Sequence, residues 1–263
     1  MRRYTSGPTG FTFDWDWSIT PAIKFLIIAC AAVYVLQLLV GYLVGPAAEH
    51  KYIELYFGLV PYAVTHLLLI WQPFTYLFLH DTHDIWHIVL NMFFLWMFGR
   101  DVERAWGRKR FYTYYFLCGV GAGVINVIVK TIMDPHGLGA ALIPTIGASG
   151  AIFGVLLAAA VLFPHQRVFL FPFPVAITMR VFVLVMGVIE FFGTLGAGGD
   201  NVAHVCHLGG MLVGYLYLRR GSYLYGVRNK FTDWKRRRLS RKFETYQRRH
   251  RDEPPRPPDN WVN

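Results

Sequence analysis

The sequence is poor in charged residues, and this shortage already limits what the protein can be. Charged residues make up 16% of its 263 residues, whereas 54% are hydrophobic. Soluble domains carry about 25% charged residues, so this chain has too little polar surface to cover a globule in water. Its hydrophobicity also excludes disorder over most of its length. The length suits one domain of about 200 residues with tails.

The sequence also has few cysteines and lacks the sequence motif of zinc metalloproteases. The three cysteines, Cys30, Cys118 and Cys206, are far apart in apolar runs, and no Cys-x-x-Cys pair occurs. This excludes a disulfide framework and favours buried small hydrophobic side chains. The His-Glu-x-x-His motif of zinc proteases is missing as well, because the stretch His204–His207 contains no glutamate.

The positive charge is concentrated in one tail. From Arg219 onward, 14 Lys and Arg residues stand against five acids, so the tail carries +9 of the net charge of +10. The remaining body is nearly neutral and apolar, which is the distribution of a membrane protein. We therefore expect the lipid bilayer as a partner and no nucleic acid. The basic tail can adhere to anionic headgroups.

Six apolar stretches are long enough, or nearly long enough, to cross a bilayer. They cover residues 22–45, 85–99, 111–133, 149–163, 174–195 and 202–218. The apolar stretch 52–79 is broken by Pro61 and Pro73 and predicts a long loop with short interfacial helices. We expect an all-α polytopic membrane protein with a six-helix bundle. Its predicted parts are an N-terminal tail over 1–20, the bundle over 21–220, and a basic, partly disordered tail over 221–263.

The basic residues predict an orientation. Both termini and the even-numbered connections carry nearly all the Lys and Arg residues outside the apolar stretches, with Lys51 as the exception in the first loop. This places the termini and these connections in the cytoplasm by the positive-inside rule. No N-terminal transit peptide is evident, because Asp14 and Asp16 are atypical of one. We therefore predict an integral protein of a bacterial cytoplasmic membrane with both termini in the cytoplasm.

Polar residues inside the apolar stretches gather at one depth. His80, His83, His87 and Asn91 lie at the outer end of the second stretch, Ser149 at the outer end of the fourth, and His204 and His207 near the outer end of the sixth. A polar group in a bilayer is costly unless it is paired or faces a wet cavity. These residues are therefore the candidates for a functional site.

Ser149 stands between glycines at the predicted start of a helix. The free backbone N–H groups of the first helical turn suit a developing oxyanion, and the hydroxyl is exposed enough to be a nucleophile. A serine that only caps the helix is the alternative for this segment taken alone.

His207 favours the catalytic interpretation. Gly210 and Gly214 share its helix face, so a neighbouring helix can approach closely, and Gly150 and Gly154 offer a matching face. This approach would bring the imidazole of His207 to the hydroxyl of Ser149 as a general base. The ring of Phe153, one turn after Ser149, can then stack on the imidazole and hold it.

His87 and Asn91 lie one turn apart on one face and can add oxyanion donors; a buried interhelical hydrogen bond is the alternative. Glu190, inside 174–195, can make a structural contact with Asn201 or a histidine of the last stretch, or act in catalysis or gating. A metal held by His80, His83 and His87 is a weaker possibility.

These motifs resemble those of rhomboid intramembrane serine proteases. Gly147–Gly150 matches the family's Gly-x-Ser-Gly, His87–Asn91 its His-x-x-x-Asn, and His207–Gly214 its His-x-x-Gly-x-x-x-Gly. The resemblance extends over about residues 21–220. Two positions depart from it: Gln72 follows Trp71 where some members carry arginine, and Phe153 stands where tyrosine is common.

The resemblance implies a serine endopeptidase with a Ser–His dyad and no metal or other cofactor. Ser149 would be the nucleophile and His207 the general base, with an oxyanion hole made of the Ser149 N–H, His87 and Asn91. Gly147, Gly150, Phe153, Gly210 and Gly214 would support them. The substrates implied are single-span membrane proteins. A non-catalytic rhomboid-like protein that binds membrane clients is the alternative, and a transporter is disfavoured by the lack of broken-helix repeats.

Overall fold

The computed structural model describes residues 18–136, 139–170, 175–195 and 204–220. The chain divides into two units, Met1–Tyr215 and Leu216–Asn263, and every candidate site residue belongs to the first. The predicted tails over 1–20 and 221–263 lie almost entirely outside the described residues, as does Asn201.

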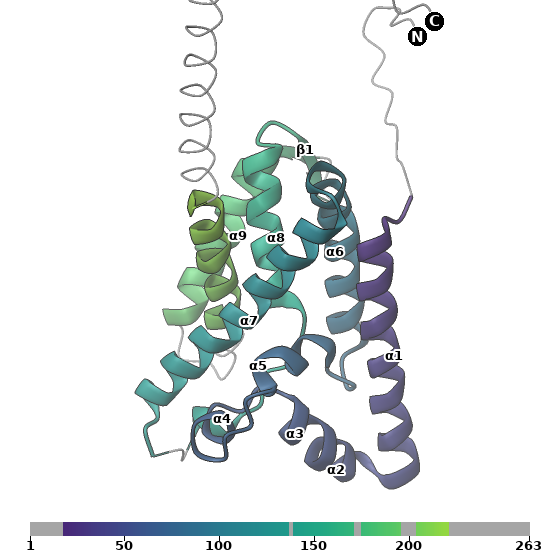
Figure 1. The fold of residues 1–263 in the computed structure, drawn as a ribbon, viewed down its shortest axis with the longest axis vertical. Coiled ribbons are helices and arrows are strands. Elements are labelled where there is room, and N and C mark those ends of the chain that lie inside the picture. Colours follow the sequence, from purple (N-terminus) through teal and green to yellow (C-terminus); the bar gives the residue numbers. More distant parts are fainter. Residues whose placement is uncertain (1–17, 137–138, 171–174, 196–203, 221–263) are drawn as a thin grey trace, which may run out of the picture. The chain divides into compact units, whose positions relative to one another are not determined.

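Each of the six apolar stretches contains a helix (Figure 1). Five are α1 (Pro21–Val44), α6 (Ile85–Trp106), α7 (Arg108–Met133), α8 (Ser149–Leu162) and α9 (Met179–Leu195). The final helix covers residues 204–220. Two of them, α1 and α7, are long and apolar enough to cross a bilayer by length and composition, and α8 is a shorter apolar helix. The count of six membrane crossings stays a prediction.

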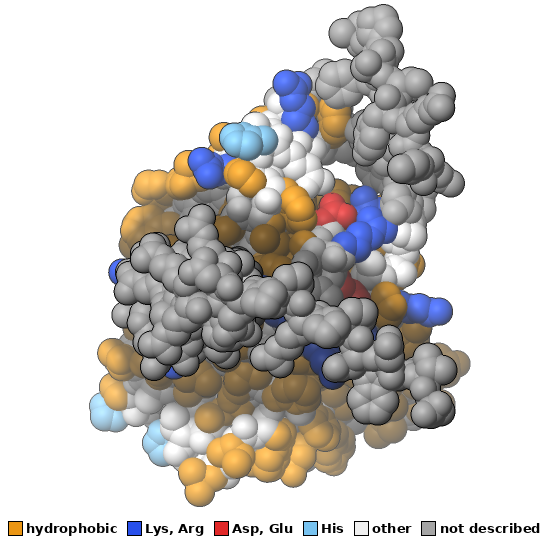
Figure 2. Space-filling model, turned by 45° about the horizontal axis from the view of Figure 1, so that its top comes forward, with side chains coloured by type: hydrophobic (Ala, Val, Ile, Leu, Met, Phe, Trp, Pro, Cys, Tyr) orange, Lys and Arg blue, Asp and Glu red, His pale blue; other side chains and the backbone are white. Residues whose placement is uncertain are grey.

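The outward faces of these helices are apolar. On α1, Phe25, Ile28 and Leu36 are each more than half exposed, and on α9 Leu184 and Phe192 are 65% exposed. Hydrophobic side chains likewise spread over much of the described surface in Figure 2. Large contiguous apolar surface is rare on soluble monomers and is what a surrounding bilayer requires.

Helix α8 lies at the centre of the described helices, packed against α6 and α7 (Figure 1). Small residues make this burial possible. Gly119 on α7 faces Ala151, and a Cβ at Gly154 would come within 2.6 Å of the side chain of Cys118. Bulkier residues at these positions would push the helices apart.

The stretch between α1 and α6 is built from short helices, as predicted. They are α2 (Pro46–Glu49), the π-helical segment η1 (His50–Glu54), α3 (Leu55–Phe57), α4 (Pro61–His66), α5 (Gln72–Thr75) and the 3₁₀ segment η2 (Tyr76–Phe78). Gln72 is fully buried and donates to the carbonyl of Leu55 at 2.9 Å, while its amide oxygen accepts from the N–H of Val60 at 2.9 Å. The indole of Trp71 donates to the carbonyl of Tyr56. The Trp71–Gln72 pair therefore anchors this loop without an arginine.

The prediction of an all-α fold is wrong in one place. The strands β1 (Arg167–Leu170) and β2 (Val175–Thr178) pair antiparallel between α8 and α9, with Arg167 opposite Thr178. Residues 175–178 were expected within the fifth helix. Their β-branched residues, Val175, Ile177 and Thr178, pack well on a pleated surface, and helix α9 begins only at Met179. A short 3₁₀ segment, η3 (Ala140–Leu142), precedes α8.

Helix α1 begins against α6. The carboxylate of Glu103 accepts hydrogen bonds from the backbone N–H groups of Ala22, at 3.0 Å, and Ile23, at 3.2 Å, and from the hydroxyl of Thr20. The first turn of a helix has N–H groups without intrahelical partners, and its positive end attracts an anion. Glu103 supplies that anion from 81 residues further along the chain.

Candidate active site

The turn before α8 places Ser149 at the first helical position. Gly147 has a φ of +121°, a conformation that favours glycine, and its N–H donates to the carbonyl of Tyr76 at 2.9 Å. A Cβ at Gly147 would lie 2.8 Å from His87 Nε2. No side chain caps this helix start. The N–H groups of its first turn therefore remain available near the Ser149 hydroxyl.

The final helix brings His207 to Ser149. His207 Nε2 lies 2.7 Å from Ser149 Oγ, which is a hydrogen-bond distance. The glycines of the two helices allow this approach, because a Cβ on Gly210 would be 1.8 Å from the carbonyl oxygen of Gly150. Gly214 serves a different contact from the one expected, since a Cβ there would lie 2.5 Å from the Tyr114 hydroxyl on α7.

The ring of Phe153 holds the imidazole of His207 in one plane. The two ring centroids are 4.3 Å apart and the planes differ by 12°, so the rings are stacked. Phe153 lies one turn after Ser149 on α8, and one helix thus positions both the hydroxyl and the wall against which the imidazole rests. The missing tyrosine hydroxyl leaves the stacking intact.

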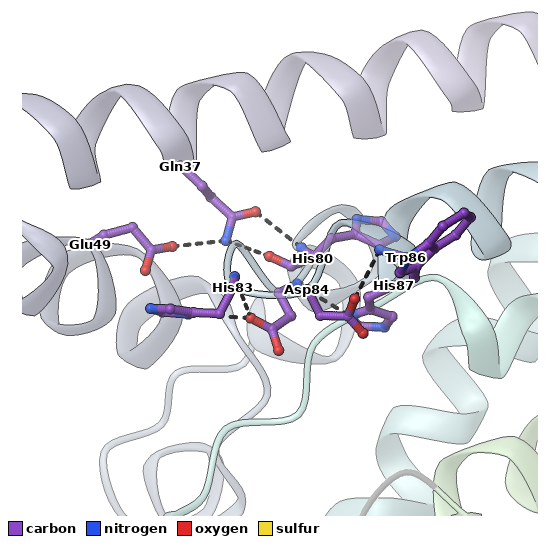
Figure 3. A network of polar contacts seen from close by, with 8 residues as sticks. Gln37, Glu49, His80, His83, Asp84, Trp86 and His87 are labelled. Atoms are coloured by element: carbon purple, nitrogen blue, oxygen red, sulfur yellow. Dashed lines mark hydrogen bonds and ion pairs between the residues drawn. The ribbon is translucent and has the colours of Figure 1, made fainter.

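His87, on α6, presents Nε2 to the start of α8. Its Nδ1 accepts a hydrogen bond from the backbone N–H of Asp81 at 3.2 Å, so in the neutral ring the proton resides on Nε2. Nε2 is the atom that lies next to Gly147. This tautomer makes His87 a donor toward the region above Ser149. Asp84 caps the start of α6, and its carboxylate accepts from the N–H of Trp86 (Figure 3).

Asn91 follows His87 by one turn and donates one amide hydrogen to the backbone carbonyl of His87 at 2.7 Å. The remaining Nδ2 hydrogen is a second potential donor. A cavity of about 440 Å³ connects these groups, and its apolar lining includes Phe94, Phe182 and Met186. Its polar lining includes Asp81, Asp84, His87, Asn91, Ser149 and His207.

The segment before α6 is fixed to α1 by Gln37. The amide of Gln37 donates to the carbonyl of His80 at 3.0 Å and accepts from its N–H at 3.0 Å, and it also donates to Glu49 (Figure 3). His80 is fully buried, whereas His83 points outward beside Asp81. His80, His83 and His87 do not form a metal-binding group among the described residues.

A second cluster lies behind His207. Oε2 of Glu190, on α9, is 2.6 Å from Nδ1 of His204 and 2.9 Å from Nδ1 of His207. The latter contact has ion-pair distance without good hydrogen-bond alignment. Of the alternatives open for Glu190, a contact with the histidines of the last helix is the one found. His204 itself does not contact Ser149 in this arrangement.

Glu190, His204 and His207 also form the one group of possible metal ligands in the described part of the chain, with donor atoms within 4.8 Å of one another. Ligands about 2.0–2.1 Å from a tetrahedral zinc ion lie about 3.4 Å apart. The separations of 2.6 and 2.9 Å are shorter and match a hydrogen-bonded cluster. The residue types could bind a metal ion, but the distances between their ligand atoms fit direct hydrogen bonds and ion pairs within the cluster better.

Sequence reasoning missed Tyr76, and it named Gln72 only as a departure from the family pattern without assigning it a role. Tyr76 accepts from Gly147 through its carbonyl and lines the cavity, and Gln72 fixes the loop that carries Tyr76. Gln72 had a signal, since an amide next to tryptophan in an apolar loop needs partners. Tyr76 acts through its backbone, which no residue type reveals.

Comparison with known proteins agrees with the motifs. A model of the Rhomboid domain matches residues 69–223. The chain is 31% identical over 134 residues to Rhomboid protein 1, mitochondrial, of Saccharomyces cerevisiae, covering 51% of this chain and 37% of that protein. It is 28% identical over 144 residues to the presenilin-associated rhomboid-like protein, mitochondrial, of Homo sapiens, covering 52% and 35%.

RHOMBOID-like protein 12, mitochondrial, of Arabidopsis thaliana is 29% identical over 155 residues, covering 54% of this chain and 45% of that protein. The matched region thus spans less than half the length of these curated relatives.

The relatives correct the predicted location. They are named as mitochondrial proteins and point to a mitochondrial membrane, so the prediction of a bacterial cytoplasmic membrane with cytoplasmic termini is wrong. The positive-inside rule distinguishes two sides of a membrane, and it carries no information on which membrane is meant. The Rhomboid match covers more than half of the 263 residues, and with the motifs in place on their helices, the chain belongs to the rhomboid family.

Proposed function

We propose that this protein is an intramembrane serine endopeptidase that cleaves transmembrane segments of membrane proteins with a Ser149–His207 dyad. The observation that carries the proposal is the 2.7 Å separation of His207 Nε2 and Ser149 Oγ at an uncapped helix start. A serine hydroxyl is a weak nucleophile on its own, and a base at this distance activates it. The Rhomboid match supports the same reaction class.

In the reaction proposed, Ser149 Oγ attacks the carbonyl carbon of the scissile peptide bond while His207 Nε2 takes the hydroxyl proton. The tetrahedral intermediate collapses when His207 gives this proton to the leaving amine. Water entering from the cavity then hydrolyses the acyl-enzyme, with His207 as base again. No cofactor takes part in these steps.

The oxyanion of the intermediate would be held by three groups. The backbone N–H of Ser149 belongs to the free first turn of α8, and His87 presents Nε2–H beside Gly147. The second amide hydrogen of Asn91 is the third donor. Donors fixed in place before the charge develops need no reorganisation during the reaction, which makes them effective.

The substrate class follows from the surroundings of the site. The helices around the cavity expose apolar faces, so a substrate reaches it from the bilayer. We propose single-span membrane proteins whose helix unwinds near the site, because a peptide bond inside an intact helix is shielded. In this proposal residues 21–220 form the protease domain with six crossings, the relatives' names support a mitochondrial membrane, and no nucleic acid takes part.

The test is cleavage of a fluorogenic single-span model substrate by the full chain in detergent micelles. We expect Ser149→Ala to lose about 10³-fold or more in kcat, since the nucleophile is gone. Thr194→Ala removes a hydroxyl that bonds only within α9 and should keep full activity.

Activity that survives Ser149→Ala, or that a chelator abolishes, contradicts the proposal. Substrate binding by the wild type with neither cleavage nor labelling of Ser149 by a fluorophosphonate would indicate a non-catalytic client-binding protein instead.

A further inference from the structure

The mechanism above uses one nitrogen of His207 and leaves the other unexplained. Nδ1 of His207 faces Glu190, a carboxylate that is only 8% exposed among apolar side chains of α9. Burying a carboxylate is costly unless it is paired, so its place next to the base needs a reason.

The proton on His207 has a required position. Because Nε2 has to accept the proton of Ser149, the ring must carry its own proton on Nδ1 in the resting state. A carboxylate beside Nδ1 favours this tautomer and stabilises the imidazolium that forms when Nε2 is protonated. Glu190 Oε2 lies 2.9 Å from Nδ1, at ion-pair distance, where its negative charge favours both.

Glu190 is itself held in place by His204. The 2.6 Å contact with His204 Nδ1 fixes the same oxygen that faces His207. His204 can approach α9 only because residue 193 is glycine, since a Cβ there would lie 2.6 Å from the His204 ring. His204, which packs where Gly193 leaves space, thus holds the Glu190 carboxylate in position.

We propose that Glu190 is a positioning residue of the catalytic centre and makes the dyad a Ser149–His207–Glu190 triad. This inference rests on the proposed function. Glu190 stays ionised throughout: the proton moves from Ser149 Oγ to His207 Nε2 and on to the leaving amine, and none passes to the carboxylate. The other groups around His207 are Ser149 and Phe153 on α8, His204 on its own helix and, through space, His87 on α6.

Two other roles for Glu190 make different predictions. If it only ties α9 to the final helix through His204, then removing His204 should be as harmful as removing the carboxylate. If the cluster binds a metal, a chelator should change the activity of the wild type. The experiment separates these roles by comparing variants of the full chain.

The variants are Glu190→Gln, Glu190→Asp, His204→Asn, His207→Ala and the double variant Glu190→Gln/His207→Ala. Each is assayed with the fluorogenic single-span substrate, by the rate of Ser149 labelling with a fluorophosphonate, and by thermal unfolding, with and without EDTA. We expect Glu190→Gln to lower kcat about tenfold to a hundredfold with KM unchanged. The labelling rate should fall in parallel, Glu190→Asp should recover part of the loss, and His204→Asn should lose less than Glu190→Gln.

The double variant is the sharpest arm. In the absence of His207, Glu190→Gln should lower residual labelling no further, because the carboxylate acts through that imidazole. An additive loss overturns the inference, as do wild-type activity in Glu190→Gln, equal losses in His204→Asn, and inhibition by EDTA. If Ser149→Ala stays active, the proposed function fails; if only the Glu190 variants stay active, the dyad stands without its third member.

Discussion

Two helices of this protein begin against neighbouring elements, and their first turns meet opposite environments. At the start of α1, the carboxylate of Glu103 accepts from the N–H groups of Ala22 and Ile23. At the start of α8, no side chain caps the helix, and Ser149 occupies the first helical position beside a cavity. One helix start is closed by an anion of the protein, and the other is left open.

The difference shows how one physical feature serves stability or function. Each helix start offers free N–H groups and a partial positive charge. A fixed carboxylate at α1 satisfies them permanently. A fixed carboxylate at α8 would compete with the oxyanion that the reaction has to form, and the open start next to a nucleophile is therefore what the proposed chemistry requires.

We expect the largest effect from a substitution that separates α8 from the final helix, because this contact brings His207 to Ser149. In Gly210→Val the new Cβ would meet the Gly150 carbonyl, whose position is fixed by the helix backbone. We expect undetectable cleavage and a clearly lower unfolding temperature. Gly187→Val is the matched control, because a Cβ at this position would meet only the flexible Met211 side chain at 3.4 Å. More than a tenth of wild-type activity in Gly210→Val would contradict the close packing.

Removing one oxyanion donor near the start of α8 should lower catalysis without changing the packing of that helix. We expect His87→Ala to lower kcat by about 10²–10³-fold with the unfolding temperature little changed, as for other oxyanion donors. Single-turnover cleavage of the model substrate measures this loss. His83→Ala is the control, because this neighbouring side chain is 79% exposed. Equal effects of the two variants would show that His87 has no special role.

A substitution at the capped start of α1 should have the opposite pattern, with lower stability and unchanged catalysis. Glu103→Gln keeps the shape but removes the charge that faces the first turn of α1, and we expect the free energy of unfolding to fall by about 2 kcal/mol. Cleavage per folded molecule should stay unchanged. Thermal unfolding and a rate corrected for the folded fraction measure both quantities. A loss of kcat in the folded fraction would mean that the two helix starts are coupled.

The sequence allowed the local arrangement of the site residues to be predicted, but not the long-range contacts or the strand pair. Residue spacing along a helix is local, so His87 and Asn91, or His207 and Gly210, could be assigned to common faces from the sequence. The contact of Glu103 with Ala22 joins residues 81 positions apart and has no periodic signal. The strand Val175–Thr178 was predicted as part of the fifth helix, because hydrophobicity alone does not distinguish a short strand from the start of a helix.

The other end of α1 offers the smallest and most specific effect. Gln37 on α1 holds the backbone of His80, and burial lowers the pKa of this histidine from its ordinary 6.5 to about 4, with the nearby His87 adding to the shift and the Phe78 carbonyl opposing it. The unfolded chain binds a proton below pH 6.5, and the folded chain does not until pH falls to about 4. The free energy of unfolding should therefore decrease as pH falls through this window, by about 1 kcal/mol between pH 7.5 and 5.5.

Unfolding in detergent micelles at a series of pH values measures this dependence. His80→Gln should flatten the slope, whereas His83→Gln, on an exposed side chain, should leave it as in the wild type. The comparison uses slopes, so a general loss of stability in His80→Gln does not obscure it. An unchanged slope in His80→Gln would mean that another group takes up the proton. A flattened slope would show that the α1 end near the site is sensitive to acid through His80.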